Sequence, residues 1–337
     1  MKEKKFDLVC LGELLMDMFS GRAVINSEEA NIFIPKPGGA PANVAVAARR
    51  LGLNSGFIGK VGVDYFGNFL AEVMEEEGVD TGGLCFDPDV RTTMAVIFST
   101  GKESQDFTFY RNPGADQTLS KNDLNLDMLR STKILHVGSL SLSDEPARTA
   151  TFEAVDIASN AGAMISYDVN YRPDVWEDAS QALTLIRKML NRVNLVKVNE
   201  VEAALLVDQA VIDPNDLGSV EDTALQLLEL GPDCIVITFG SSGSYFQTNE
   251  GGKFVPPYRI EAVDMVGCGD AFVAGLLKRF SLADVWVNEL SPENMIENLL
   301  FANAVGALTS MNVGAIPSMP YLEDVNKFME KHNRENL

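Results

Sequence analysis

Residues 263–272 read Val-Asp-Met-Val-Gly-Cys-Gly-Asp-Ala-Phe and combine two features that phosphate chemistry needs. Gly267, Cys268 and Gly269 make a compact turn, and Asp270 follows at once. Apolar residues then recur at helical spacing, so a helix is expected to begin at Gly269 or Asp270. The first turn of a helix carries unpaired N–H groups and partial positive charge, which attract phosphate oxygens.

A carboxylate in the same turn can take a proton from a substrate hydroxyl. The segment therefore favours phosphoryl transfer to an alcohol, with the turn as anion cradle and Asp270 as base. The alternative is structural, because Asp is a favoured N-cap and glycines make turns. The helix terminus also predicts a modestly lowered pKa for the Cys268 thiol, which would make it the first cysteine to be alkylated.

Charge and cysteine content limit the partners. Among 337 residues there are 48 acidic and 27 basic ones, which gives a net charge of −21. Binding to nucleic acid needs clustered Lys and Arg, so neither nucleic acid nor an anionic membrane is an expected partner. The four cysteines form no CxxC pair, which disfavours zinc and disulfides. No signal-peptide pattern or membrane-length apolar run occurs, and we expect a cytoplasmic protein.

The elements that must position the turn alternate between strand and helix patterns. Strands are predicted at 6–11, 55–61, 134–137, 164–168, 195–197 and 234–238, and helices at 66–77, 147–161, 180–190, 200–207, 220–230, 271–280 and 294–310. Such alternation predicts an α/β fold with parallel strands and helices on both faces. Residues 92–98 and 106–110 instead predict a hairpin, and 21–37 is expected to be irregular. We expect one domain over 1–337, with a small β lid from roughly 13–37 and 90–112.

Polar residues follow several predicted strands, where open parallel sheets bind ligands. Each cluster alone is typical of a turn, but together they indicate a site: Asp17; Asp168, Asn170 and Arg172; Asn199 and Glu202; Thr238, Gly240 and Gly243. Only two histidines occur, so a Ser–His or Cys–His nucleophile is not expected. The sequence has no GxxxxGK[ST] and no GxGxxG after the first strand, which disfavours a P-loop ATPase and a nicotinamide dehydrogenase.

These motifs resemble the ribokinase-like (PfkB-type) carbohydrate kinase family over nearly the whole chain. The N-terminal signature is matched by Gly38-Gly39-Ala-Pro-Ala-Asn43 and Gly59-Lys-Val-Gly62-x-Asp64-x-Phe-Gly67, the C-terminal one by Asp264-Met-Val-Gly-Cys-Gly-Asp270, and the metal-associated motif by Asn199-x-x-Glu202. Segments 109–116 and 138–146 are similar to those of fructokinases. The resemblance implies a three-layer αβα sandwich with a mostly parallel central sheet and a small β lid.

The resemblance also implies a role for each site residue. Asp270 would be the base, and Gly267, Cys268 and Gly269 the anion hole for the γ-phosphoryl group of ATP. Asn199 and Glu202 would organise Mg²⁺ through water. The sugar would be bound by Asp17, Gly38, Gly39, Asn43, Asp168 and Asn170, with Arg111 and Arg172 closing the pocket, and the nucleotide by Thr238, Gly240, Gly243 and Asn303. The β lid would form the interface of a homodimer.

The implied reaction converts D-fructose and ATP to fructose 6-phosphate and ADP, as in a fructokinase. A 2-keto-3-deoxygluconate kinase is an alternative, because residues 168–173 also suit that group and Arg111 and Arg172 could hold a carboxylate. A catalytically silent kinase-like binding protein is another, although the intact Asp270 argues against it. The family usually has Thr at the position of Met265 and Ala at that of Cys268, so a dependence on K⁺ is left open.

Overall fold

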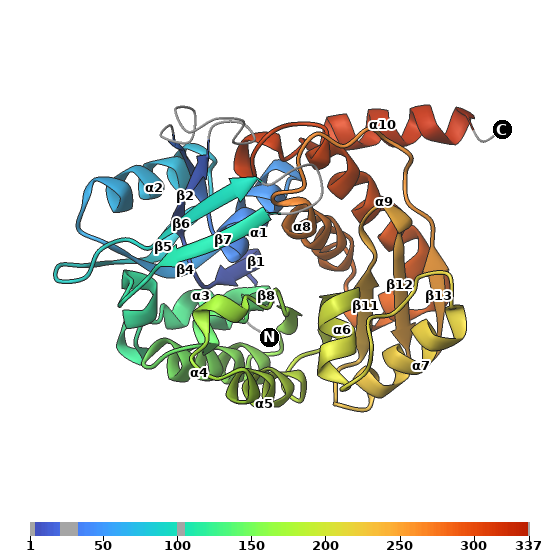
Figure 1. The fold of residues 1–337 in the computed structure, drawn as a ribbon, viewed down its shortest axis with the longest axis horizontal. Helices are drawn as coiled ribbons and strands as arrows, with labels where there is room; N and C mark the ends of the chain where they lie inside the picture. Colours follow the sequence, from blue (N-terminus) through green and yellow to red (C-terminus); the bar gives the residue numbers. More distant parts are fainter. Residues whose placement is uncertain (1–3, 21–32, 100–104, 336–337) are drawn as a thin grey trace.

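The computed structural model describes residues 4–20, 33–99 and 105–335. Within this part the largest element is a nine-stranded sheet in the order β13-β12-β11-β10-β9-β8-β1-β4-β5 (Figure 1). All strands from β11 to β5 run parallel, and β12 and β13 are antiparallel to their neighbours. The strands are β1 Phe6–Leu11, β4 Ser55–Gly62, β5 Asp80–Asp87, β8 Thr132–Gly138, β9 Met164–Asp168, β10 Leu195–Asn199, β11 Cys234–Thr238, β12 Ser244–Thr248 and β13 Gly251–Val255.

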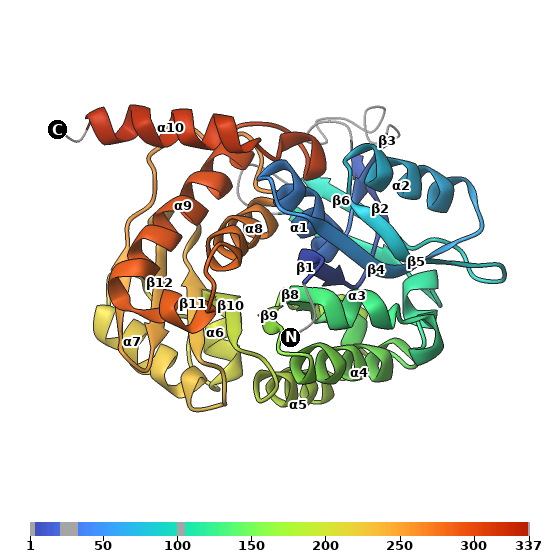
Figure 2. The same cartoon turned by 180° about the vertical axis from the view of Figure 1, so that it is seen from behind.

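Helices cover both faces of this sheet, and each face has its own apolar core. One core is closed by α1 Ala40–Arg50, α2 Tyr65–Glu76, α8 Cys268–Ser281, α9 Pro292–Ser310 and α10 Leu322–Glu335. The other is closed by α3 Leu126–Ser131, α4 Ala147–Asn160, α5 Ala179–Leu190, α6 Glu200–Leu206 and α7 Leu217–Leu228. Figures 1 and 2 show the two helix layers from opposite sides. The three-layer αβα architecture is the one that the sequence predicts.

A second, four-stranded sheet has the order β3-β2-β6-β7. It consists of β2 Leu15–Ser20, β3 Phe33–Gly38, β6 Met94–Ser99 and β7 Gln105–Tyr110. The predicted hairpin is β6–β7, which pairs antiparallel. The expectation of irregular structure was wrong for 33–37, which belong to β3, while 21–32 lie outside the described residues. Pro35 and Pro37 obscure the strand pattern, and β3 tolerates them because it is an edge strand.

Several elements have no counterpart in the sequence-based prediction. β5, the antiparallel pair β12–β13, and the helices α3 and α10 were missed. β5 and β13 contain consecutive glycines at Gly82-Gly83 and Gly251-Gly252, which weaken a strand pattern. In the part of the chain that the structure describes, no helix is both long enough and apolar enough to cross a bilayer.

The sheet topology brings the candidate residues to one edge. Parallel strands β1, β9, β10 and β11 all end there, and the N-terminal turns of α1 and α8 meet beside them. Contact between α1 and α8 is direct, because Asn43 of α1 hydrogen bonds to Asp270 of α8. Residues distant in the sequence therefore share one site.

Candidate active site

The turn before α8 requires glycine at Gly267. Gly267 is the N-cap and has a φ of 76°, and a Cβ there would lie 2.9 Å from Ala315. The Asp264 side chain braces the same turn, because its carboxylate accepts hydrogen bonds from the amides of Val266 at 3.1 Å and Gly314 at 2.8 Å. The turn is thus fixed against the loop that follows α9.

The first turn of α8 leaves several backbone amides without a partner. Ala271 N–H donates to the Gly267 carbonyl at 2.9 Å, and Cys268 N–H donates to the Met265 carbonyl at 3.3 Å. Within the described residues, the amides of Gly267, Gly269 and Asp270 have no backbone acceptor. These three amides offer the anion cradle expected at a helix N-terminus. The amide of Cys268 contributes less than its predicted role implies, since it already has an acceptor.

Asp270 lies at the third position of α8, and its side chain does not cap the helix. The structural alternative of an N-cap is therefore wrong for this residue. Its Oδ2 accepts a hydrogen bond from Asn43 Nδ2 at 2.8 Å. Burial raises the pKa of Asp270 to about 6, and the hydrogen bond from Asn43 opposes that rise. The carboxylate is mainly ionised at neutral pH and can still accept a proton.

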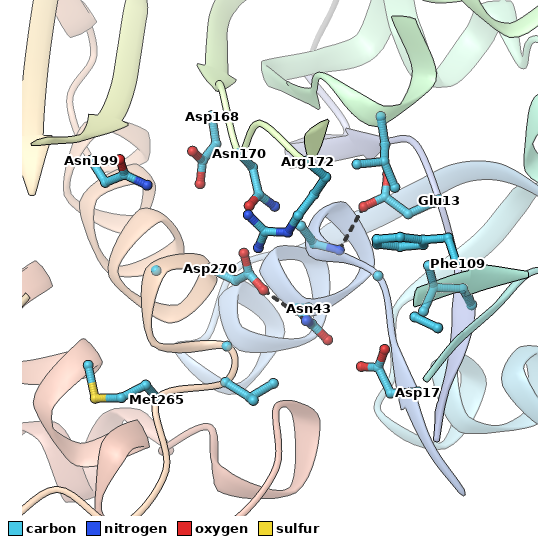
Figure 3. A pocket seen from close by; sticks show the side chains of 18 of the residues that line it. Glu13, Asp17, Asn43, Phe109, Asp168, Asn170, Arg172, Asn199, Met265 and Asp270 are labelled. Carbon is cyan, nitrogen blue, oxygen red and sulfur yellow. Dashed lines mark hydrogen bonds between the residues drawn. The ribbon is translucent and has the colours of Figure 1, made fainter. Parts of the chain in front are cut away.

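A cavity of about 240 Å³ opens beside Asp270 (Figure 3). It brings together ten of the predicted site residues: Asp17, Gly39, Asn43, Asp168, Asn170, Arg172, Asn199, Gly267, Gly269 and Asp270. Glu13, Phe109, Lys197 and Met265 also line it, and none of these four had a predicted role in binding. The first two come from the segments that form or border the small sheet, so both sheets contribute walls.

Asp17 lies on β2, and its carboxylate occupies the space beside Gly38 of the paired strand β3. It is 6% exposed, and a Cβ at Gly38 would lie 2.0 Å from its Oδ2. Gly38 does not line the cavity, and it acts by making room for this carboxylate. Burial and the charges of Asp270 and Glu13, opposed by Arg172, raise the pKa of Asp17 to about 8.

Lys197 is a site residue that the sequence reasoning missed. Its Nζ lies 3.2 Å from both carboxylate oxygens of Asp168, and a Cβ at Gly269 would lie 3.3 Å from it. Burial lowers its pKa, but the charges of Asp168, Glu202 and Asp270 outweigh that effect and raise it. The ammonium is therefore charged and close to the anion cradle. A lysine inside the apolar strand Leu-Val-Lys-Val-Asn is the signal that could have found it.

Glu13 was also missed. It follows β1 and is 4% exposed. Its Oε1 accepts a hydrogen bond from the Ala40 amide at 2.9 Å, so it caps α1, whose N-cap residue Gly39 has no side chain. Its Oε2 is buried without a partner in the described structure. Burial raises the pKa of Glu13 to about 7, and the charge of Asp116 adds to the rise.

The structure does not bring Arg111 to the cavity wall, contrary to its predicted role in closing the pocket. Its side chain is 3% exposed and forms an ion pair with Asp116 at 2.7 Å. The same guanidinium donates to Ser143 Oγ at 2.8 Å and to the Leu140 carbonyl at 3.2 Å. Arg111 thus joins β7 to the segment that contains Leu140, and it supports the wall from behind. The sequence alone does not show that Arg111 forms an ion pair with Asp116.

Asn199 and Glu202 form a reciprocal cap at the start of α6. Asn199 accepts from the amides of Val201 and Glu202, and Glu202 accepts from the amide of Asn199 at 2.9 Å and that of Tyr171 at 2.8 Å. Only Asn199 lines the cavity, because Glu202 is buried behind it. Among the described residues, no group of three or more His, Cys, Asp or Glu could hold a metal ion.

A second cavity of about 430 Å³ adjoins the first, and both include Met265 and Gly269 in their walls. It is lined by all four residues predicted to bind the nucleotide: Thr238, Gly240, Gly243 and Asn303. Pro257, Tyr258, Ile260 and Phe272 give it an apolar wall suited to an aromatic base. Gly243 has a φ of 116°, and a Cβ there would lie 2.5 Å from the Val255 carbonyl. The turn before α8 therefore stands between two cavities.

The expectation of a lowered pKa at Cys268 was wrong. Burial and the charges of Asp264 and Asp270 together raise the pKa of this thiol to about 12. The thiol also lies 3.6 Å from the carbonyl of Asp264. The partial charge of the helix terminus is too small to offset burial and two carboxylates.

Comparisons with known proteins show to which proteins the chain is similar. The family model described as pfkB family carbohydrate kinase matches residues 5–322. Fructokinase-1 of Zea mays is 38% identical over 330 residues, which cover 96% of this chain and 98% of the relative. The crystal structure of fructokinase with bound ATP from Xylella fastidiosa has a TM-score of 0.86 and 31% identity, and the match covers 97% of this chain and 98% of that one.

A second solved structure is similar to the same extent. Fructokinase from Vibrio cholerae O395, in a form with bound fructose, ADP and calcium ion, has a TM-score of 0.83 and 31% identity. The match covers 96% of this chain and 99% of that one. These similarities extend across both cavities and both sheets, because they cover nearly all of the chain.

Proposed function

This chain belongs to the pfkB family of carbohydrate kinases, and we propose that it transfers the γ-phosphoryl group of ATP to fructose at the junction of its two cavities. One observation carries this proposal. The carboxylate of Asp270 lines the first cavity, and the helical turn that carries it and the unpaired amides separates the two cavities, since Gly269 lines both. A hydroxyl acceptor and a phosphoryl donor are thereby offered the base and the anion cradle together.

In the proposed reaction, Asp270 accepts the proton of the hydroxyl on C6 of fructose while that oxygen forms its bond to the γ-phosphorus. The bond between the γ-phosphorus and the bridging oxygen breaks, and its electron pair leaves with ADP. The amides of Gly267, Gly269 and Asp270 donate to the oxygens of the transferring group. Lys197 adds a fixed positive charge on the same side, because its Nζ lies beside Gly269.

The choice of a neutral sugar over a sugar acid is supported by Arg111. A substrate such as 2-keto-3-deoxygluconate needs cationic partners for its carboxylate, and Arg111 and Arg172 are the candidates from the sequence. Arg111 is 3% exposed and already paired with Asp116, so it is unsuited to that task. Lys197, another cation of the cavity, is already paired with Asp168, and the ionised Asp270 in the same cavity would repel an acid. A silent binding protein is disfavoured because Asp270 has a pKa of about 6 and suits a base.

We propose that Mg²⁺ enters with ATP and is held chiefly by its phosphate oxygens. Mg²⁺ keeps several waters and takes few protein ligands, which agrees with the lack of a protein cage among the described residues. Asn199 would contact its hydration shell, and Glu202 would position Asn199 through the reciprocal cap. When bound, the ion neutralises phosphate charge. A dependence on K⁺ is part of the same proposal, although Met265 lacks the side-chain hydroxyl of the Thr that the family usually has at this position.

A homodimer through the four-stranded sheet is also a proposal. Ile34 on β3 and Tyr110 on β7 are 50% and 61% exposed, so both edges of this sheet present apolar surface. Sedimentation of the wild type and of Tyr110→Lys tests it, and an unchanged monomer mass for both would contradict it. A cytoplasmic location stays a prediction from the sequence.

The activity is tested by ADP release from ATP with purified chain and a panel of acceptors. We expect fructose to give the highest kcat/KM, and NMR of the product to identify fructose 6-phosphate. A higher kcat/KM with 2-keto-3-deoxygluconate would assign the sugar acid instead. Slow ADP release that no acceptor stimulates would favour a binding protein.

A further inference from the structure

The sugar side of the first cavity carries more acidic than basic side chains. Glu13, Asp17 and Asp270 line one space in the close view (Figure 3). Arg172 faces both Asp17 and Asp270, and Lys197, which is paired with Asp168 at 3.2 Å, also acts on Asp270. Among the residues that line the cavity, four carboxyl side chains therefore stand against two cations: Glu13, Asp17, Asp168 and Asp270 against Lys197 and Arg172.

Two buried acceptor atoms in this wall lack a donor in the described structure. Glu13 Oε2 and Asn43 Oδ1 are both buried without a hydrogen-bond partner, and each residue is 4% exposed. Both residues line the cavity. Leaving a buried acceptor unpaired is costly, so these atoms favour a ligand that brings N–H or O–H donors. These two unpaired atoms indicate a ligand, and this evidence does not depend on the number of acidic side chains in the cavity.

The carboxylates also disfavour one another. Burial and the charges of Asp270 and Glu13, opposed by Arg172, raise the pKa of Asp17 to about 8. Burial raises the pKa of Glu13 to about 7. At neutral pH the cavity therefore holds protons that a positive ligand could displace, because a nearby cation stabilises the ionised carboxylates.

We propose that the sugar site binds polyhydroxylated cations, in the form of cyclic amines with the hydroxyl pattern of fructofuranose, more tightly than the matching neutral sugars. This inference rests on the proposed function for the shape of the ligand. The ammonium supplies the positive charge and donors that the wall of Glu13, Asp17 and Asp270 lacks, while the hydroxyls take the places of those of the sugar. Such amines act as competitive inhibitors toward fructose.

The test is calorimetric titration of the full chain with two ligands of the same shape. In 2,5-dideoxy-2,5-imino-D-mannitol the ring atom is a protonated amine at pH 7, and in 2,5-anhydro-D-mannitol it is an oxygen. We expect the amine to bind at least about tenfold more tightly at constant ionic strength, since close charge pairs across a binding interface can add net affinity. Titration in two buffers of different ionisation enthalpy should also reveal release of protons.

Variants distinguish the effect of the cavity on the preference for the amine from the effect of the net charge of the whole chain. Asp17→Asn and Glu13→Gln should each reduce the preference for the amine. Asp127→Asn removes one negative charge from the exposed face of α3 and should preserve the preference. Equal affinities for the two ligands in the wild type would overturn the inference. A preference that survives both cavity variants would overturn it as well, because attraction to a chain of net charge −21 would then explain it.

Titration with fructose keeps the two proposals distinguishable. Binding of fructose without a preference for the amine overturns this inference and leaves the kinase proposal standing. Tight binding of the amine, lost in Asp17→Asn, with no binding of fructose supports the cation site and contradicts the proposed substrate.

Discussion

Asn43 Nδ2 donates a hydrogen bond to Asp270 Oδ2 at 2.8 Å, and this contact joins the first turns of α1 and α8. The two residues are 227 positions apart in the sequence. The bond stabilises the ionised form of Asp270 and so opposes the effect of burial on its pKa. Asn43 therefore fixes both the direction of the carboxylate and the pH range in which it is a base.

Replacing Asn43 by Ala should move the acid limb of the pH profile of kcat/KM to higher pH. A hydrogen bond to a charged group is worth about 1.5–3 kcal/mol, which corresponds to a move of roughly one to two pH units. The matched control is Asn170→Gly, which removes another asparagine of the cavity and suits the left-handed φ of 37° there. An acid limb that stays in place in Asn43→Ala would contradict the role of the hydrogen bond.

Lys197→Met should lose activity through charge, and a double variant can separate this from loss of stability. The single change leaves Asp168 buried and unpaired, which costs about 3–5 kcal/mol. Adding Asp168→Asn removes the orphaned charge, so thermal denaturation should recover while kcat does not. Recovery of kcat together with Tm would instead make Lys197 a structural residue.

Asp17→Asn should make the folded protein more stable at pH 8 while impairing binding of the sugar. The pKa of Asp17 is about 8 in the folded chain against an ordinary 3.8, so the folded state holds the proton more strongly. Its contribution to stability is present below pH 3.8 and is lost as the pH rises toward 8. Urea denaturation should give a gain on the order of 5 kcal/mol at pH 8 and little gain at pH 4. A variant less stable than the wild type at pH 8 would contradict this.

Cys268 should react slowly with iodoacetamide at neutral pH, since its pKa is about 12 and only the thiolate attacks. Cys85 is half-buried and also has a raised pKa, while Cys10 and Cys234 are fully buried. Peptide mapping should find any early label at Cys85, with activity retained. Rapid label at Cys268 that ATP slows would restore the expectation from the sequence.

The alternation of strand and helix patterns predicts the parallel sheet well, because buried parallel strands are short apolar runs with clear ends. The strands β1, β9 and β11 have the predicted bounds. β3 was missed because two prolines obscure it, and β13 because of its glycines. Edge strands need less regular patterns, so the sequence marks them less clearly.

Site residues at strand ends and in glycine turns were predictable because their local motifs are distinctive. Lys197 and Glu13 were not predicted, since their importance comes from Asp168 and Ala40, which are distant in the sequence. The behaviour of Cys268 also depended on tertiary structure, because burial decides its pKa. Pairing and burial arise from packing, and a single sequence does not display them.

The central claim is that Asp270 is the base for phosphorylation of fructose, and the most direct test is kcat of Asp270→Asn. Asparagine keeps the shape and can still pair with Asn43, but it cannot accept the proton. We expect kcat with fructose at saturating ATP to fall by about 10²–10⁴-fold, with unchanged affinity for ATP and an unchanged melting curve. A kcat within a few-fold of the wild type would contradict the account.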